Sequence, residues 1–347
     1  MTLAVASTPH RDQWYFIIRG TSYTDLEKLE FATTSLCSNR NPANSSRPNT
    51  SKTKKPDNAM AEANVEVEGI NYHTEYSLPD SQDKSAPCVL LVHALMSNLH
   101  MWDSTVKALH AAGYSTLRYD HVGHHNTPPP PQSKTTERRM SVSGQLAYHM
   151  DDLTRHMHQL VKERTGQTQV AAVIGCSIGG VLALRYGMMF PDHVDQIISI
   201  AAPGIKATED KKPLWSQRIK QFEEDEKNGT DTLCRATVER WFPGGLEDDD
   251  VRAEALKHVK TCSLEGYKLL ADTIRNYDYT EELHTFPNEG CLIIGGTADG
   301  AISIDALEFI TSYIQGSKLV KMEGVGHLPP MEKPKQFEEI MLGFLER

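Results

Sequence analysis

The chain has 347 residues, a mass of 38.8 kDa and a formal net charge of −10. This acidic balance argues against a nucleic-acid partner, which would need a basic patch or stripe. Hydrophobic residues make up 39% of the chain, enough for a large core, but no apolar run approaches the roughly 20 residues of a membrane span. Six scattered cysteines with no C-x-x-C pair predict neither a disulfide framework nor a zinc site.

The first part of the chain differs in composition from the rest. Residues 35–55 are rich in Ser, Asn, Thr, Pro and Lys, a composition that cannot bury enough apolar surface to become ordered. We predict that residues 1–63 form an extension with a disordered, low-complexity core, and Met60 is an alternative start. Residues 1–20 lack the pattern of a secretory signal, and the C-terminus is not a peroxisomal address. A cytoplasmic location is expected, with a mitochondrial one as the weaker alternative.

From residue 64 onward, strand and helix patterns alternate. The predicted strands are a hairpin around Gly69 and the segments 88–92, 114–119, 170–174, 196–201, 291–294 and 318–322. The predicted helices are 101–112, 143–163, 178–189, 304–314 and 334–345. Such alternation indicates an α/β fold with a mostly parallel sheet flanked by helices. In these folds ligands bind at the carboxyl ends of the strands.

Residues 203–287 interrupt this alternation with helical patterns only. Because the insertion follows a central strand at the ligand-binding edge, we interpret it as a cap; the alternative is a helical subdomain with a structural role. The predicted organisation is an extension (1–63), a first core part (64–202), a cap (203–287) and a second core part (288–347).

The segment Gly175-Cys176-Ser177-Ile178-Gly179-Gly180 lies between a predicted strand and a predicted helix. A G-x-S-x-G sequence in this context predicts a nucleophile elbow, a sharp turn that exposes the serine hydroxyl. Ser177 is therefore the candidate nucleophile, and the neighbouring Cys176 is expected to point into the core.

Two backbone N–H groups are candidates for an oxyanion hole. The N–H of Ile178 lies at a helix N-terminus, where its partial positive charge can stabilise an oxyanion. The loop after strand 88–92 supplies the second donor in such folds, and Leu95 is the candidate by position. His93 in the same loop is interpreted as a structural histidine.

Asp299 and His327 each follow a predicted strand of the second core part. They are therefore expected at the same sheet edge as Ser177. The chain order of serine, acid and histidine is that of the Ser-His-Asp triad on this kind of sheet. Either residue alone is weak evidence, but the three positions together predict nucleophilic catalysis.

From about Ala63 to Arg347 the chain resembles the α/β-hydrolase family and, more closely, its 3-oxoadipate enol-lactonase-like branch. The stretches that carry the resemblance are VHALMSNLHMWD (92–103), LRYDHVGHHNT (117–127), IGCSIGG (174–180), VERWF (238–242), LEGYKLLADTIRNYDYT (264–280), GGTADG (295–300) and GVGHLPPMEKP (324–334). The resemblance implies a hydrolase fold without metal or organic cofactor. It also implies Ser177 as nucleophile, His327 as base, Asp299 as its orienter, and Leu95 with Ile178 as the oxyanion hole.

The chain departs from the family pattern at two loops. His93-Ala94 replaces the usual His-Gly, and residues 120–125 read DHVGHH where the family has Asp-x-Arg-Gly-x-Gly. We expect the two additional histidines to change the pocket beside that loop, and hence the substrate.

These observations predict a serine hydrolase that cleaves a small-molecule ester or lactone through an acyl-enzyme. The alternatives are an acyltransferase or a C–C hydrolase with the same triad, for example in secondary metabolism, and a non-catalytic binding module. Dehalogenase and epoxide hydrolase activities are disfavoured because their elbow nucleophile is an aspartate. The sequence leaves the oligomeric state open.

Substrate recognition is expected to depend on the cap. Trp241, Phe242 and Tyr267, with Tyr277, are candidates for an apolar wall. The cap arginines Arg218, Arg235 and Arg240 are candidates to meet a carboxylate. Helix packing and solvated helix faces are the alternative explanations for these residues.

Overall fold

The computed structural model describes residues 61–130, 148–243, 249–283 and 290–346. Nearly all of the predicted N-terminal extension lies outside these ranges, as do the first residues of the predicted helix 143–163.

The described chain forms an eight-stranded sheet in the order β1-β2-β4-β3-β5-β6-β7-β8. The strands are β1 (Ala61–Val67), β2 (Ile70–Ser77), β3 (Cys88–Val92), β4 (Ser115–Tyr119), β5 (Val170–Cys176), β6 (Val194–Ile200), β7 (Cys291–Gly296) and β8 (Lys318–Met322). β1 and β2 form the predicted antiparallel hairpin, and β2 is antiparallel to β4. The remaining pairs are parallel, so the carboxyl ends of β3 to β8 share one edge.

The sequence of the central strands explains their position. β3 (CVLLV) is buried along its whole length, as is every residue but one of β5. A continuous apolar run is what a parallel strand covered on both faces requires. The edge strand β8 mixes lysines with apolar residues, and only Met322 in it is buried.

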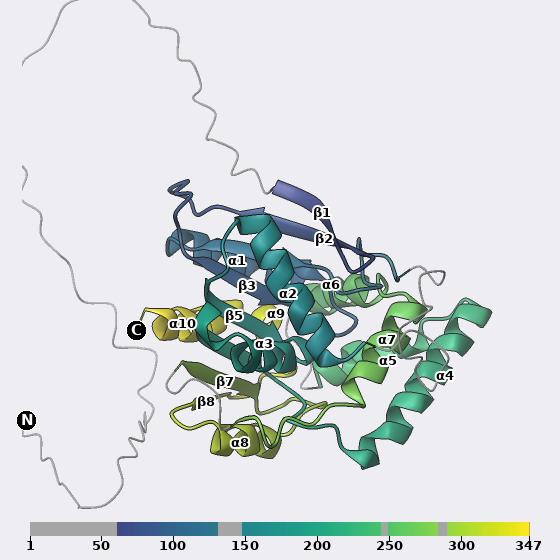
Figure 1. Cartoon of the computed structure of the whole chain (residues 1–347). Helices are drawn as coiled ribbons and strands as arrows, with labels where there is room; N and C mark the ends of the chain where they lie inside the picture. Colours follow the sequence, from purple (N-terminus) through teal and green to yellow (C-terminus); the bar gives the residue numbers. More distant parts are fainter. Residues whose placement is uncertain (1–60, 131–147, 244–248, 284–289, 347) are drawn as a thin grey trace, which may run out of the picture. The chain divides into compact units, whose positions relative to one another are not determined.

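The core helices cover both faces of the sheet. They are α1 (Asp103–Ala111), α2 (Met150–Thr165), α3 (Ile178–Met189), α8 (Ile304–Tyr313), α9 (Pro329–Glu332) and α10 (Pro334–Leu345), with short 3-10 turns at Leu99–Trp102, Pro191–His193 and Glu209–Lys211. α2 packs against α3, and α1 packs against α10. Figure 1 shows α2 and α3 in front of the strands, with α1 on the other side.

Helix α2 begins at Met150, so the predicted start at residue 143 is wrong. Tyr148 and His149 are not helical. The carboxylate of Asp152 accepts the backbone N–H of His149 at 2.8 Å and fixes the start of the helix.

In the described part of the chain, four α-helices lie between β6 and β7. They are α4 (Lys212–Asn228), α5 (Thr232–Trp241), α6 (Asp249–Val259) and α7 (Leu264–Ile274). α4 contacts α5 and α7, and α5 contacts α6. Figure 1 shows the four helices grouped at one side of the sheet. Among all helices in the described ranges, none combines the length and apolar character needed to cross a membrane.

Candidate active site

Ser177 lies at the turn between β5 and α3, with a backbone conformation of φ 59° and ψ −118°. A positive φ is strained for a residue with a side chain, and it persists only where neighbouring structure enforces it. Here the N–H of Ser177 donates to the carbonyl of Ile200 at 2.8 Å. The carbonyl of Ser177 accepts the N–H groups of Gly180 and Val181 at 2.9 and 3.2 Å. The strained turn is thus held by β6 on one side and by α3 on the other.

The two glycines of the elbow are required by close backbone contacts. A Cβ at Gly175 would lie 1.9 Å from the carbonyl oxygen of Gly179. A Cβ at Gly179 would lie 2.2 Å from the carbonyl oxygen of Val92 at the end of β3. The G-x-S-x-G spacing therefore permits α3 to start directly against the central strands.

His327 and Asp299 meet at the carboxyl edge of the sheet. The Nδ1 of His327 lies 2.7 Å from Oδ2 of Asp299, and both side chains are almost fully buried. The other carboxylate oxygen of Asp299 accepts the N–H groups of Ala301 and Ile302 at 2.7 and 3.0 Å. Because Nδ1 is hydrogen-bonded to the carboxylate of Asp299, the Nε2 of His327 remains available to interact with a group in the cavity.

The end of cap helix α5 holds the histidine loop in place. The backbone N–H of His327 donates to the carbonyl of Trp241 at 2.8 Å, and the two rings are stacked with centroids 6.4 Å apart. A Cβ at Gly326 would lie 2.1 Å from the same carbonyl oxygen. The cap therefore fixes the position of His327 as well as covering the site.

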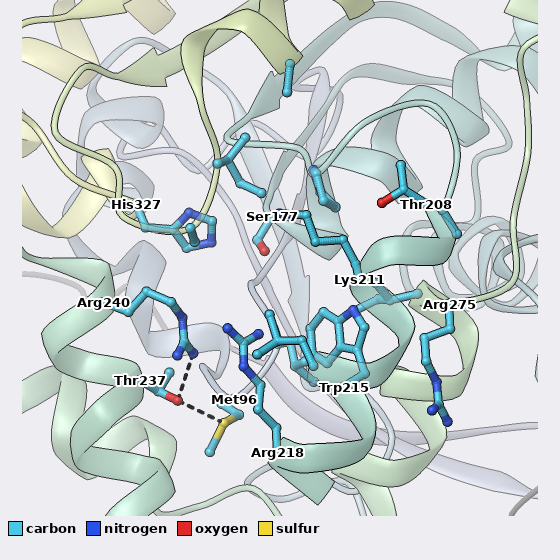
Figure 2. Close-up of a pocket in the computed structure, with 18 of the residues that line it drawn as sticks. Met96, Ser177, Thr208, Lys211, Trp215, Arg218, Thr237, Arg240, Arg275 and His327 are labelled. Carbon is cyan, nitrogen blue, oxygen red and sulfur yellow. Dashed lines mark hydrogen bonds between the residues drawn. The ribbon is translucent and has the colours of Figure 1, made fainter.

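Ser177 and His327 line one cavity of about 340 Å³. Figure 2 shows the hydroxyl of Ser177 and the imidazole of His327 facing one another in it. Core residues such as Leu95 and Met96 contribute to the wall, and the rest comes mainly from the cap and the segment leading into it. Asp299 stands behind His327 and is not among the lining residues.

The two candidate oxyanion donors lie near the nucleophile. Leu95 is 8% exposed and lines the cavity, while Ile178 is fully buried as the first residue of α3. Within the described part of the chain, neither backbone N–H donates a hydrogen bond to a protein acceptor. Both donors are therefore available to an oxyanion.

The thiol of Cys176 is turned away from the cavity. Its Sγ donates to the carbonyl of His327 at 3.6 Å, and the side chain is fully buried. Burial, and then the nearby Asp299 carboxylate, raise the pKa of this thiol well above its usual value. The expectation that Cys176 points into the core is confirmed.

The histidines of residues 120–125 are not among the residues that line this cavity. Instead, three imidazoles join this loop to the loop after β3. His93 donates from Nδ1 to the carbonyl of Ala94 and accepts the N–H of His121 at Nε2, both at 2.8 Å. His121 donates from Nε2 to the carbonyl of His93 at 2.8 Å.

His124 completes this histidine cluster. Its Nδ1 donates to the carbonyl of Val122 at 3.0 Å, and its Nε2 accepts the backbone N–H of Met96 at 3.0 Å. Burial lowers the pKa of His121 to about 3 and that of His124 to about 4, and it also lowers the pKa of His93. All three rings are therefore neutral near pH 7, as the acceptor roles of His93 and His124 require.

The predicted apolar wall is divided between the cavity and the core. Trp241 and Tyr267 line the cavity, and Tyr277 does so as well. Phe242 is 1% exposed and belongs to the buried core instead, because the chain has turned at the end of α5. Arg218 and Arg240 line the cavity, whereas Arg235 is exposed and paired with Asp231.

Met96 and Trp215 are among the wall residues that sequence reasoning missed. Met96 adopts a left-handed conformation (φ 65°), which no sequence pattern predicts for methionine. Its Sδ accepts the hydroxyl of Thr237 at 3.7 Å, which connects the oxyanion loop to the cap. Trp215 lies on α4 and packs near Tyr267, with ring centroids 6.4 Å apart. The sequence signal for this position is a tryptophan within an amphipathic helical pattern of the cap.

Residues 87–334 match the sequence profile of a family described as alpha/beta hydrolase fold. The chain belongs to the α/β-hydrolase family. This membership confirms the predicted fold class and the resemblance on which it rested.

The relatives of this α/β hydrolase differ in their named activities. The chain is 24% identical over 274 residues to monoacylglycerol lipase abhd6-B of Xenopus laevis, covering 75% of each chain. It is 24% identical over 308 residues to epoxide hydrolase 1 of Caenorhabditis elegans, covering 82% of this chain and 70% of that one. The enol-lactonase of Burkholderia xenovorans LB400 shares the fold with a TM-score of 0.68 and 20% identity, covering 82% of this chain and 100% of the other.

Proposed function

We propose that this chain is a serine hydrolase that cleaves carboxylic ester or lactone bonds. The observation that carries the proposal is the His327–Asp299 hydrogen bond of 2.7 Å, with His327 lining the same cavity as the strained serine elbow. An imidazole oriented by a carboxylate and facing a serine hydroxyl is the arrangement that activates an alcohol as a nucleophile.

The first half-reaction forms an acyl-enzyme. The Oγ of Ser177 attacks the carbonyl carbon of the substrate while Nε2 of His327 accepts the hydroxyl proton. The carboxylate of Asp299 stabilises the resulting imidazolium and keeps Nδ1 protonated. The negative charge on the former carbonyl oxygen is accepted by the N–H groups of Leu95 and Ile178. The tetrahedral adduct collapses, and the leaving alcohol takes the proton from His327.

The second half-reaction regenerates the enzyme. A water molecule attacks the acyl carbon, and His327 accepts a proton from it. The ester bond to Ser177 then breaks, the serine oxygen regains the proton, and the carboxylic acid is released. In a lactone the leaving hydroxyl remains attached to the acyl part, so a single hydroxy acid is released. The chemistry uses only protein groups and water.

The names of the relatives support ester or lactone cleavage in general terms. Monoacylglycerol lipases and an enol-lactonase are named for such bonds. We do not extend the named activity of epoxide hydrolase 1 to this chain, because Ser177 takes the place of the aspartate nucleophile expected for that activity. A cytoplasmic location is part of the proposal, and fractionation of cells that produce the protein tests it.

A panel of p-nitrophenyl esters and aliphatic lactones, assayed with the unmodified protein and with Ser177→Ala, tests the function. We expect turnover of at least one ester or lactone class, and a loss of more than about 10⁴-fold in kcat in Ser177→Ala because no nucleophile remains. Adding alcohol and thiol acceptors detects acyl transfer, and 1,3-diketones detect C–C hydrolysis. Equal turnover by Ser177→Ala would contradict the proposal.

A further inference from the structure

The cavity wall carries two arginines without an acidic partner. Arg218 comes from α4 and Arg240 from α5, and both line the cavity that contains Ser177 and His327. Figure 2 shows their guanidinium groups near each other and turned into the cavity. Within the described ranges, neither group forms an ion pair with an aspartate or a glutamate.

Among the residues that the structure describes, nearly all N–H donors of this pair have no acceptor. Arg240 donates one hydrogen bond, from Nη2 to the hydroxyl of Thr237 at 3.0 Å. Arg218 lies over the ring of Trp215, 5.1 Å from its centroid, and has no hydrogen bond to another described residue. A guanidinium carries five N–H donors, so the two groups present a concentrated set of donors to the cavity.

The other cap arginines show that this arrangement is particular to the pair. Arg275 also lines the cavity but is paired with Asp272, and Arg235 is paired with Asp231. Neighbouring arginines are therefore paired with acidic residues, whereas Arg218 and Arg240 form no ion pair within the described ranges.

The pair is electrostatically unfavourable in the free protein. Burial lowers the pKa of Arg218, and burial together with the charge of Arg218 lowers the pKa of Arg240 to about 10. Both groups remain charged near neutral pH, so two partly buried like charges repel each other. An anion between them would remove this repulsion and engage the unused donors in strong charge-assisted hydrogen bonds.

We propose that Arg218 and Arg240 form an anion-binding subsite, and that the natural substrate is an ester or lactone bearing a carboxylate or a phosphate group. The substrate part of this inference rests on the proposed hydrolase function; the binding part does not. The anionic group would lie beneath the cap helices α4 and α5 while the scissile carbonyl reaches Ser177. The specificity of the enzyme would then be set by charge as well as by the apolar wall.

Binding is measured first, in the Ser177→Ala protein, so that the result does not depend on turnover. Monoethyl adipate and butyl phosphate are the anionic probes, and diethyl adipate is the neutral one, each titrated by calorimetry. We expect Arg218→Gln and Arg240→Gln, in that background, to weaken binding of at least one anionic probe by about 10- to 100-fold relative to the neutral probe. The matched control is Arg235→Gln, which removes an exposed cap arginine and should leave this ratio unchanged. The preferred probe identifies the anion.

Turnover is measured second, as the ratio of kcat/KM for mono-p-nitrophenyl adipate to that for p-nitrophenyl hexanoate. The ratio should fall in Arg218→Gln and in Arg240→Gln but not in Arg235→Gln. If the glutamine variants do not fold, Arg240→Lys and the salt dependence of binding in Ser177→Ala replace them. Anion affinity should then fall with added NaCl while affinity for the neutral probe does not.

Equal affinity for anionic and neutral probes, or equal losses in Arg235→Gln, would overturn the subsite. An absence of all ester and lactone turnover, with selective anion binding retained, would instead overturn the proposed function and leave the subsite intact.

Discussion

Met96 has a left-handed backbone conformation, and its N–H is accepted by the imidazole of His124. A residue with a side chain occupies this conformation at a cost, and here a fully buried ring supplies the compensating hydrogen bond. Since Met96 directly follows the candidate oxyanion donor Leu95, this hydrogen bond fixes the part of the loop on which stabilisation of the oxyanion depends.

Replacing His124 with leucine should lower kcat while changing KM less. The leucine cannot accept the N–H of Met96, so the loop would relax and the donor at Leu95 would move. Outright loss of an oxyanion donor costs about 10²–10³ in kcat, and we expect displacement of the loop to cost about tenfold. Steady-state kinetics of His124→Leu and His124→Gln would measure the effect.

His124→Gln is the matched variant because an amide oxygen can still accept a hydrogen bond. It should retain more activity than His124→Leu. Unchanged kcat in His124→Leu would show that the imidazole does not position the oxyanion loop.

The position of a residue in the fold was predictable where neighbouring residues in the sequence determine it. The turn at Ser177 could be predicted because glycines and a preceding strand specify it, and the sheet-edge positions of Asp299 and His327 because each follows a strand. Phe242 could not be separated from Trp241, since their inward or outward placement depends on where α5 ends. The partners of His121 and His124 could not be predicted either, because their hydrogen bonds join loops that are distant in sequence.

At the scale of elements, the loop after β4 joins the core to the cap. The backbone N–H and the hydroxyl of Ser263 both donate to the carbonyl of Gly123, at 2.8 and 2.9 Å. Gly123 also packs directly against Gly266 in α7, where a Cβ at Gly266 would lie 2.5 Å from the Cα of Gly123. Two glycines in contact allow the cap to approach the core this closely.

Gly266→Ala should therefore destabilise the protein by about 1–3 kcal/mol, the usual cost of forcing additional volume into a packed contact. The matched control is Gly343→Ala in α10, where a Cβ meets nothing within 4 Å. Alanine at that helical position should be neutral or stabilising by up to about 1 kcal/mol. Urea unfolding measures both, and a Gly266→Ala protein as stable as the unmodified one would refute the close packing.

Element boundaries were predictable where a sharp local signal exists. β3, α3, β8 and α10 have the predicted limits because proline, glycine or polar residues end their apolar patterns. The predicted 291–294 strand extends to Gly296 as β7, since backbone pairing with β8 continues past its apolar residues. Pairing of this kind depends on neighbouring strands, which the pattern within one segment does not contain.

At the scale of the whole molecule, the buried neutral histidines link stability to pH. The folded-state pKa values of His121 and His124, about 3 and 4, lie below the value of about 6.5 expected in the unfolded chain. Between these values the unfolded chain binds protons that the folded protein does not. This contribution to the free energy of unfolding is complete above about pH 6.5 and falls as the pH drops towards 4.

Asp120 changes the free energy of unfolding with pH in the opposite direction to the histidines, because burial raises its folded pKa to about 7. The difference between the unmodified protein and His124→Gln isolates the histidine. Between pH 7.5 and 4.5, the unmodified protein should lose about 2–3 kcal/mol more of its unfolding free energy than His124→Gln loses. Urea unfolding at several pH values measures this, and parallel pH profiles would contradict a buried neutral His124.

The central claim is that Ser177 is a nucleophile activated by His327, and covalent labelling with a fluorophosphonate tests it most directly. Peptide mapping by mass spectrometry should place the label on Ser177 in the unmodified protein. Labelling should be absent in Ser177→Ala and much slower in His327→Ala. A folded, unmodified protein that remains unlabelled, or one labelled at the same rate when His327 is replaced, would contradict the account.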